Sequence, residues 1–138
     1  MYGVFAAHYA RKNICVLSDN HARIGESDNY KLEGQLQTEY VKPGLQRQVL
    51  GYNDDIMLVK VIFGDEMVGQ RPAMHSHPHS QSSYILSGKF ELHCGDKVQV
   101  LCAGDSFYVE PNTPHEAYCL EPGIIIDGFS PIREDFIK

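Results

Sequence analysis

The sequence lacks several features that would place the protein in a membrane, among exported proteins or on nucleic acid. No run of apolar residues approaches the roughly 20 needed to span a bilayer. Residues 1–10 lack the basic start and long apolar centre of a secretory signal. Lys and Arg number 12 against 18 Asp and Glu, so the formal net charge is −6. These absences argue against nucleic acid and membrane partners and favour a cytoplasmic protein, although a local cationic centre can still attract a small anion.

Cysteine is sparse, and its pattern excludes common metal and redox motifs. The four cysteines form no CxxC pair and no zinc-ribbon spacing. In a cytosolic chain we therefore expect free thiols, mainly buried as small apolar side chains. The four are Cys15, Cys94, Cys102 and Cys119.

Helical patterning is also scarce, whereas strand-like segments follow one another from residue 35 onward. Segments 56–63, 84–93 and 123–129 are rich in apolar and β-branched residues, and turns containing Gly, Pro and Asp separate the strands. Many short strands at regular spacing predict an antiparallel sandwich or barrel. The 138 residues suffice for one domain with a proper core, so we predict a single all-β domain.

The chain divides unevenly in this interpretation. Residues 36–138 form the predicted barrel with a short C-terminal tail. Residues 1–35 lack sustained periodicity, and we expect an N-terminal extension that packs on the barrel or on a neighbouring subunit. The short apolar piece 14–17 is a candidate for an added strand in that extension.

A hairpin is predicted between residues 84–93 and 97–101. A three-residue loop at 94–96 puts apolar pairs on one face and polar pairs on the other, whereas a two-residue turn at Gly95-Asp96 would mix them. We therefore prefer the first register, which makes His93 an exposed strand residue. Its pairs are Phe90–Val100, Glu91–Gln99, Leu92–Val98 and His93–Lys97.

The densest chemistry lies in residues 74–81, which read Met-His-Ser-His-Pro-His-Ser-Gln. On an extended strand alternate side chains point to one face, so His75 and His77 aim into the same space, as a metal site requires. A distant histidine, His115, is expected to return to this pair. Imidazole nitrogens suit zinc, nickel, iron, copper or cobalt. We favour a metal site over the alternative of buried, hydrogen-bonded core histidines.

The other polar residues of this stretch have competing explanations. His79 lies beyond Pro78, and we expect it to support the site or to lie at its rim. Gln81 is a candidate ligand through its amide oxygen, and a hydrogen bond that supports a ligand is the alternative.

The C-terminal strand offers a carboxylate followed by a cation. Ile125, Asp127 and Phe129 alternate onto one face, which should look into the barrel. A buried carboxylate near a metal is costly unless it is paired or used in chemistry. Arg133 is placed to clamp a substrate carboxylate, but an Asp127–Arg133 salt bridge that pins the C-terminus explains these residues equally well. Arg47 is a candidate second carboxylate contact, although an exposed strand arginine is the simpler explanation.

Two motifs resemble those of the cupin superfamily. They are His75-x-His77-x3-Gln81-x6-Gly88 and Gly104-x6-Pro111-x3-His115. The resemblance implies a double-stranded β-helix, or jelly-roll barrel, whose motif residues bind a metal. Most cupins have glutamate where this chain has Gln81. Three histidines and an amide carry no charge, so a bound divalent ion keeps its full positive charge and favours an anionic ligand.

Segments 74–90, 103–115 and 126–136 more closely resemble the KdgF-type pectin-degradation cupins. Those proteins convert 4,5-unsaturated monouronates from pectin or alginate into the linear, ketonised 4-deoxy-5-keto-uronate. The resemblance implies an isomerase-like metalloenzyme with one divalent transition metal ion (zinc, nickel, iron, cobalt, copper or manganese), a small anionic sugar-acid substrate and a homodimer. It implies the metal ligands His75, His77, Gln81 and His115, and the catalytic residues Asp127, Phe129 and Arg133.

Two other functions stay open at this point. A cupin can bind a sugar acid without turning it over, and a three-histidine cupin can also be a dioxygenase. Turnover of an unsaturated uronate and oxygen consumption by iron-loaded protein distinguish the three.

Overall fold

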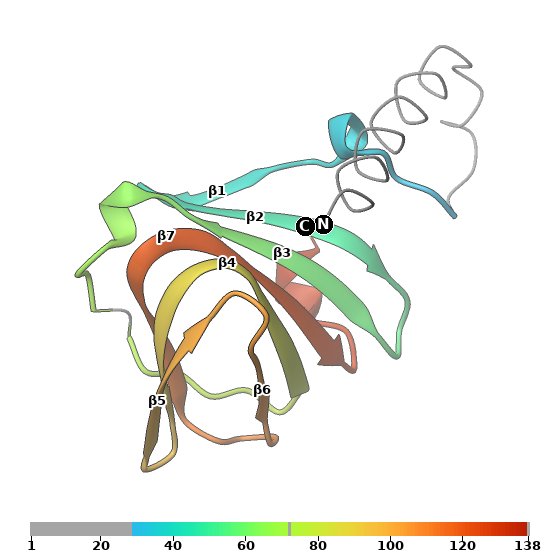
Figure 1. Ribbon diagram of the computed structural model, residues 1–138. Coiled ribbons are helices and arrows are strands. Elements are labelled where there is room, and N and C mark those ends of the chain that lie inside the picture. Colours follow the sequence, from blue (N-terminus) through green and yellow to red (C-terminus); the bar gives the residue numbers. More distant parts are fainter. Residues whose placement is uncertain (1–28, 72, 138) are drawn as a thin grey trace, which may run out of the picture. The chain divides into compact units, whose positions relative to one another are not determined.

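The computed structural model describes residues 29–71 and 73–137 (Figure 1). It divides into two units, Met1–Gln35 and Leu36–Lys138. The described part of the first unit contains the short 3-10 helix η2 (Glu33–Gln35), where the Leu32 amide donates to Gln35 Oε1 at 2.9 Å. The predicted strand at 14–17 and the predicted packing of the extension lie outside the described residues.

The second unit is an antiparallel sheet of seven strands, which confirms the all-β prediction. The strands are β1 (Glu39–Lys42), β2 (Leu45–Tyr52), β3 (Met57–Phe63), β4 (Ser80–Cys94), β5 (Lys97–Cys102), β6 (Ser106–Val109) and β7 (His115–Ser130). Two 3-10 helices accompany them, η3 (Asp65–Met67) and η4 (Glu134–Phe136). Hydrogen-bonded neighbours follow the order β1-β2-β3-β7-β4-β5, and β6 also pairs with β4. Among the described residues, no helix has the length and apolar character needed to cross a membrane.

The two longest strands, β4 and β7, bend along their length so that the sheet curls into a barrel (Figure 1). Their pairing slips three times between Ile85 and Phe90, where Gly88 has a φ of 85°. A Cβ at Gly88 would lie 2.6 Å from the Pro122 carbonyl oxygen, and one at Gly123 would lie 2.1 Å from the Ser87 carbonyl oxygen. Because two backbones meet at this distance, the bend requires residues without a side chain.

The core consists of two groups of buried side chains on the inner face of the barrel. The larger group contains Met67, Ile85, Phe90, Leu92, Leu101, Cys119 and Ile125. The smaller group contains Met57, Val59 and Phe129. Each side chain fully buried in this way stabilises the fold by about 1.5–3 kcal/mol. The smaller group lies on β3 and β7, where Val59 pairs with Asp127.

The predicted register of the 84–101 hairpin is wrong by one residue. Cys94 pairs with Lys97, His93 with Val98 and Glu91 with Val100, around a two-residue turn in which Gly95 has a φ of 60°. This register sets Phe90 opposite Leu101, and both are buried. It also turns Val98 and Val100 outward, with exposed fractions of 56% and 39%. The burial of Leu101 and the left-handed conformation of Gly95 therefore decide the register, and not the separation of apolar from polar pairs.

Two expectations about exposure also need correction. His93 lies on β4 as predicted but is only 22% exposed at its side chain, and its Nε2 donates to Glu91 Oε1 at 2.7 Å. The three described cysteines are free, as expected, yet only Cys119 is buried, whereas Cys94 is half-buried and Cys102 exposed. Cys15 lies outside the described residues.

Candidate metal centre and adjoining pocket

Three histidines from two distant segments converge at one end of the barrel. His75 and His77 lie on the segment that leads into β4, and His115 opens β7. An isolated antiparallel bridge joins His75 to His115, with N···O distances of 3.1 and 2.9 Å. One ring nitrogen of each of the three histidines lies within 4.8 Å of the others. The backbone bridge therefore brings His115 back to His75 and His77, as predicted. The two histidines themselves precede β4, which begins only at Ser80.

Each of the three imidazoles is held in the same tautomer by a backbone carbonyl. The Nδ1 atoms donate to the carbonyls of Ala73 (3.3 Å, from His75), His79 (3.2 Å, from His77) and Thr113 (2.8 Å, from His115). A carbonyl accepts only, so Nδ1 carries the proton and Nε2 presents its lone pair. Fixing the tautomer by the other ring nitrogen is how proteins prepare a histidine for a metal.

Gln81 completes this group from the first inward-facing position of β4. Its Nε2 donates to Ser83 Oγ at 3.1 Å and to Asp127 Oδ1 at 3.3 Å, so its Oε1 is directed to the opposite side. That oxygen lies 3.0 Å from His77 Nε2. Reversing the amide would place an oxygen against the Asp127 carboxylate, so the orientation is fixed by charge as well as by donors.

These residues fit a divalent transition metal ion. His115 Nε2 is buried without a hydrogen-bond partner, and His77 Nε2 and Gln81 Oε1 are two acceptors that face each other with no proton to share. Burial lowers the pKa of His77 and lowers that of His115 to about 4, so both rings are neutral at pH 7. Neutral imidazole nitrogens with one amide oxygen form a set that zinc, nickel, iron, cobalt or copper accepts.

A half-buried carboxyl group adjoins this cluster. Asp127 on β7 pairs with Val59 on one side and with Ser83 on the other, and all three side chains face inward. Ser83 Oγ donates to Asp127 Oδ1 at 2.5 Å. Burial raises the pKa of Asp127 to about 6, while the bonds from Ser83 and Gln81 and the charge of Arg133 oppose the rise. A carboxyl that titrates near neutral pH can both accept and return a proton.

Arg133 and Phe129 lie next to each other beside this carboxyl and the histidine cluster. The side chain of Arg133 is 15% exposed, and its guanidinium lies 5.3 Å over the Phe129 ring. The Phe129 ring in turn lies 5.7 Å from the ring of His77. The charge of Arg133 also lowers the pKa of His77 and of His115, so the cation acts on the histidine cluster.

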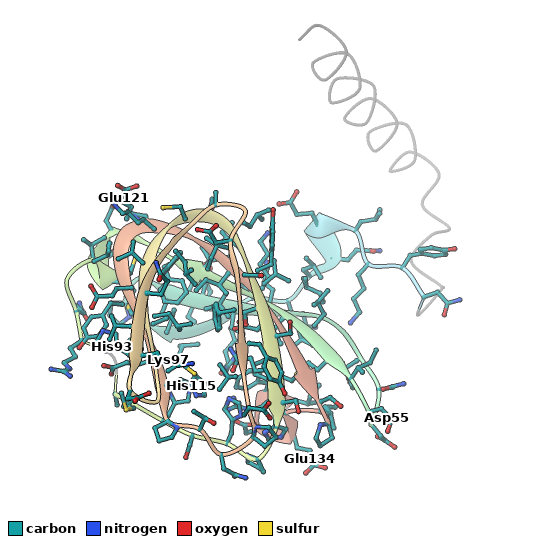
Figure 2. The ribbon with its side chains drawn as sticks, turned by 60° about the horizontal axis from the view of Figure 1, so that its bottom comes forward. Asp55, His93, Lys97, His115, Glu121 and Glu134 are labelled. Atoms are coloured by element: carbon teal, nitrogen blue, oxygen red, sulfur yellow. The ribbon has the colours of Figure 1, made fainter. Side chains whose placement is uncertain are left out.

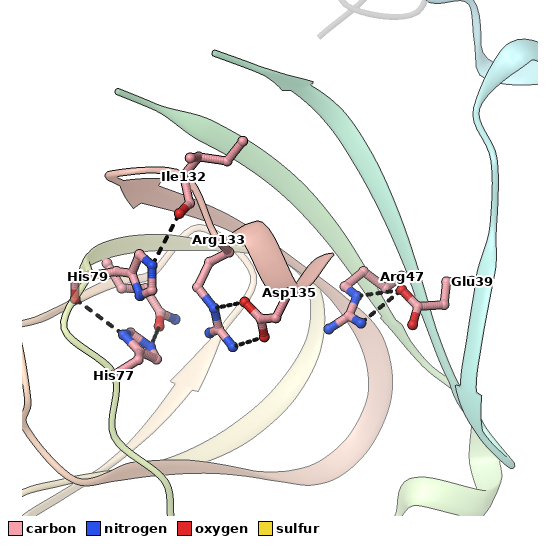
Figure 3. A network of polar contacts seen from close by, with 8 residues as sticks. Glu39, Arg47, His77, His79, Ile132, Arg133 and Asp135 are labelled. Carbon is pink, nitrogen blue, oxygen red and sulfur yellow. Dashed lines mark hydrogen bonds and ion pairs between the residues drawn. The ribbon is translucent and has the colours of Figure 1, made fainter. Parts of the chain in front are cut away.

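The alternative of an Asp127–Arg133 salt bridge does not hold. Arg133 pairs with Asp135 instead, donating from Nε at 3.0 Å and from Nη2 at 2.8 Å (Figure 3). Asp127 meets only the Ser83 hydroxyl and the Gln81 amide among the described residues. The acid and the arginine are thus separate groups that face the same space.

The structure also places the two residues with open roles. His79 packs against His77 with ring centroids 5.4 Å apart but is not one of the three histidines whose ring nitrogens converge, and its Nε2 donates to the Ile132 carbonyl at 3.2 Å (Figure 3). The interpretation of Arg47 as an exposed strand arginine is wrong: its side chain is 16% exposed and its guanidinium lies 3.6 Å over the Phe136 ring. Arg47 pairs with Val61, which pairs with the buried Ile125, so its side chain is on the inner face of the sheet.

Sequence reasoning missed Ser83, Asp135 and Phe136. Ser83 lies two residues beyond Gln81, so the period of a strand places both on one face and could have identified it. Asp135 and Phe136 lie beyond the last strand in η4, where no periodicity predicts which way a side chain points.

An apolar groove of about 690 Å³ shares Phe129 with this site and contains none of the three histidines. It is lined by Leu50, Gly51, Tyr52, Asn53, Ile56, Met57, Leu58, Ser80, Ser82, Gly128, Phe129 and Ser130. Its lining includes neither Asp127 nor Arg133.

Comparison with known proteins supports the predicted cupin fold. Residues 65–127, which contain the three histidines and Asp127, match the family model described as Cupin domain. The crystal structure of an RmlC-like cupin from Shewanella frigidimarina NCIMB 400 is 42% identical with a TM-score of 0.74, over 80% of this chain and 97% of that one. The double-stranded β-helix predicted from the two motifs is thereby confirmed.

Two further relatives carry the same name. The pectin degradation protein KdgF of Dickeya dadantii (strain 3937) is 32% identical over 110 residues, which cover 78% of this chain and 97% of the relative. The structure of KdgF from Halomonas sp. is 33% identical with a TM-score of 0.71, over 78% of this chain and 97% of that one. The similarity extends over nearly the whole of both relatives.

Proposed function

Because this chain belongs to the KdgF family of cupins, we propose that it acts in pectin or alginate breakdown as a metal-dependent, isomerase-like enzyme. The substrate in this proposal is a 4,5-unsaturated monouronate, and the product is the linear, ketonised 4-deoxy-5-keto-uronate. One observation carries the proposal: a half-buried acid, Asp127, is joined through Gln81 to His77, one of three histidines whose ring nitrogens converge within 4.8 Å.

The proposed reaction needs one proton to move and no oxidant or reductant. The hemiacetal hydroxyl at C1 loses its proton to Asp127 as the bond between C1 and the ring oxygen breaks. C1 becomes an aldehyde, and the ring oxygen stays on C5 as an enolate. Asp127 then returns the proton to C4, which yields the ketone at C5. A carboxyl with a pKa of about 6 is suited to both halves of this transfer.

The other residues bind and orient the sugar acid. Arg133 holds the substrate carboxylate through paired hydrogen bonds, and the Phe129 face packs against the ring. Ser83 and Gln81 hold Asp127 in place through their hydrogen bonds. A divalent ion held by His75, His77, Gln81 and His115 would supply positive charge that polarises a substrate oxygen. The low exposure of this region limits competing protonation by water.

The test follows the loss of the conjugated chromophore of a 4,5-unsaturated uronate against the spontaneous rate. Wild type is expected to accelerate the reaction, and Asp127→Asn to lose about 10²–10⁴-fold of that acceleration. Asp55→Asn is the matched control, because Figure 2 shows Asp55 on the loop between β2 and β3, well apart from His115. If wild type leaves the spontaneous rate unchanged, the proposed enzymatic activity is refuted. Tight binding of the uronate without turnover would identify a sugar-acid-binding cupin instead, and oxygen consumption by iron-loaded protein would identify a dioxygenase.

A further inference from the structure

The orientation of Arg133 has a structural cause that lies outside the histidine cluster. Arginine has a long side chain that loses much conformational freedom when it is held in one position. Arg133 comes after the last strand, where no sheet ladder fixes it. Its side chain is nevertheless only 15% exposed. Something in the C-terminal segment must therefore hold the guanidinium.

Asp135 holds one edge of that guanidinium. Its two carboxylate oxygens accept from Nε at 3.0 Å and from Nη2 at 2.8 Å, the paired geometry that fixes both position and plane. Nη1 donates to no acceptor among the described residues. The edge formed by Nη1 and Nη2 is therefore left for an incoming anion, while Asp135 occupies the adjacent edge formed by Nε and Nη2.

Phe136 holds the face of the same group. The guanidinium of Arg133 lies 4.2 Å over the Phe136 ring, which also packs against Phe129 with ring centroids 5.7 Å apart. A guanidinium is attracted to an aromatic face, and more strongly when the pair is desolvated. The ring thus restricts rotation of the plane that Asp135 has set.

Phe136 is itself anchored to the barrel. The guanidinium of Arg47 lies 3.6 Å over its ring, and Glu39 Oε2 accepts from Arg47 Nε at 3.1 Å and from Nη2 at 2.8 Å. Figure 3 shows Glu39, Arg47, Asp135 and Arg133 following one another across the barrel. Two arginines, each paired with a carboxylate, therefore meet at one phenyl ring.

We propose that Asp135 and Phe136 are positioning residues that hold the Nη1 and Nη2 edge of Arg133 toward a uronate carboxylate. The inference rests on the proposed function, because it assumes that Arg133 binds the acid group of the substrate. It further specifies that the carboxylate meets the end of the guanidinium and not its Nε side. Arg47 acts through Phe136 and has no contact with the substrate.

The effect of removing Asp135 on KM distinguishes this inference from the alternative that Asp135 blocks the substrate site. If Asp135 occupied the substrate site, its removal would free Arg133, and KM would fall. If Asp135 positions Arg133, its removal leaves a mobile cation, and KM rises with kcat nearly unchanged, since the lost interaction is equal in the ground and transition states. Misplacing a binding group in this way is expected to cost about tenfold or more.

The experiment measures kcat and KM of metal-loaded full-length variants with a 4,5-unsaturated uronate. Asp135→Asn and Phe136→Leu are expected to raise KM about tenfold. Glu134→Gln, an exposed acid in the same turn, should behave as wild type. Arg133→Gln combined with Asp135→Asn should equal Arg133→Gln alone, because both changes remove one interaction. A lowered KM, an effect equal to that of Glu134→Gln, or additivity with Arg133→Gln overturns the inference.

A second readout judges the inference without turnover. In nuclear magnetic resonance spectra, the Nε proton of Arg133 should exchange slowly in wild type and in Glu134→Gln, and rapidly in Asp135→Asn. Equal exchange in all three would refute the positioning role. Wild type that leaves the spontaneous rate unchanged while these exchange rates differ would refute the proposed function alone.

Discussion

Hydrogen bonds from groups outside the proposed ligand set fix the tautomer or the orientation of single residues at this site. Three backbone carbonyls set the tautomers of His75, His77 and His115, and the amide of Gln81 takes its orientation from Ser83 and Asp127. Such bonds to the outer side of a ligand decide where its lone pair points. Burial raises the pKa of Asp127 because it disfavours the charged form, and the hydrogen bonds that Asp127 accepts from Ser83 and Gln81 oppose this rise.

The raised pKa of Asp127 makes a prediction about stability. The folded pKa of about 6 lies above the ordinary value of 3.8, so between these values the folded protein binds more protons than the unfolded chain. Wild-type stability therefore falls as pH rises from about 4 to about 6 and stays lower above that. Asp127→Asn removes this cost, so in chelator-treated protein its free energy of unfolding should exceed that of wild type at pH 8 by about 2–3 kcal/mol.

Urea denaturation at several pH values measures this difference. The gain of Asp127→Asn should shrink toward zero as pH falls below about 4, where the carboxyl of wild type becomes protonated in the unfolded chain as well as in the folded protein. The exposed-site variant Asp55→Asn should show no gain at either pH. An Asp127→Asn difference that does not change with pH would mean that folding leaves the pKa of Asp127 at its ordinary value.

At the scale of elements, the site depends on how β4 and β7 cross. Gly88 and Gly123 allow the two backbones to approach where the sheet bends, and the bend lets β7 carry His115 at one end and Asp127 near the other. A sheet without this crossing would keep those two residues on a straight strand of 16 residues. The close approach of two backbones is therefore a condition for the site.

Substituting Gly123 tests this condition. In Gly123→Ala the new Cβ would lie 2.1 Å from the Ser87 carbonyl oxygen, and backbone must shift to relieve it. We expect a loss of about 2–4 kcal/mol in the free energy of unfolding. Gly51→Ala is the matched control, because its Cβ meets nothing within 4 Å on β2. Equal thermal unfolding of the two variants would show that the crossing tolerates a methyl group.

At the scale of the molecule, the metal would join segments that are distant along the chain. His75 and His77 lie before β4, whereas His115 begins the last strand, so one ion would tie both ends of the core β4–β7 pair together. An ion that binds only the folded protein stabilises it by mass action, by about 4 kcal/mol when its free concentration is a thousand times Kd.

Removal of metal should therefore lower the thermal unfolding temperature by several degrees, and zinc or nickel should restore it. His115→Ala should abolish the response to added metal because it removes one of the three converging nitrogens. His93→Ala is the control, since His93 bonds Glu91 outside the cluster and should leave the response intact. If neither chelator nor added metal changes the thermal unfolding temperature of wild type, the result would argue against a metal centre.

Much of the fold and the candidate site followed from the sequence because strands have a period of two. That period put Asp127 and Phe129 on one inward face, and the structure agrees. It failed for the 84–101 hairpin, because β5 lies at the end of the strand order and its outward valines are not covered by another strand. Where no second layer enforces alternation, turn geometry and one buried leucine decide the register.

The sequence by itself determined which residues could hold a metal, since histidine spacing on an extended chain leaves few other geometries. Only the tertiary structure decided which partners the two arginines near the site take. Arg133 met Asp135 and not Asp127, and Arg47 faced inward onto Phe136. Both outcomes depend on how the C-terminal segment returns to the barrel, and that path is set by packing between distant residues, which local periodicity does not encode.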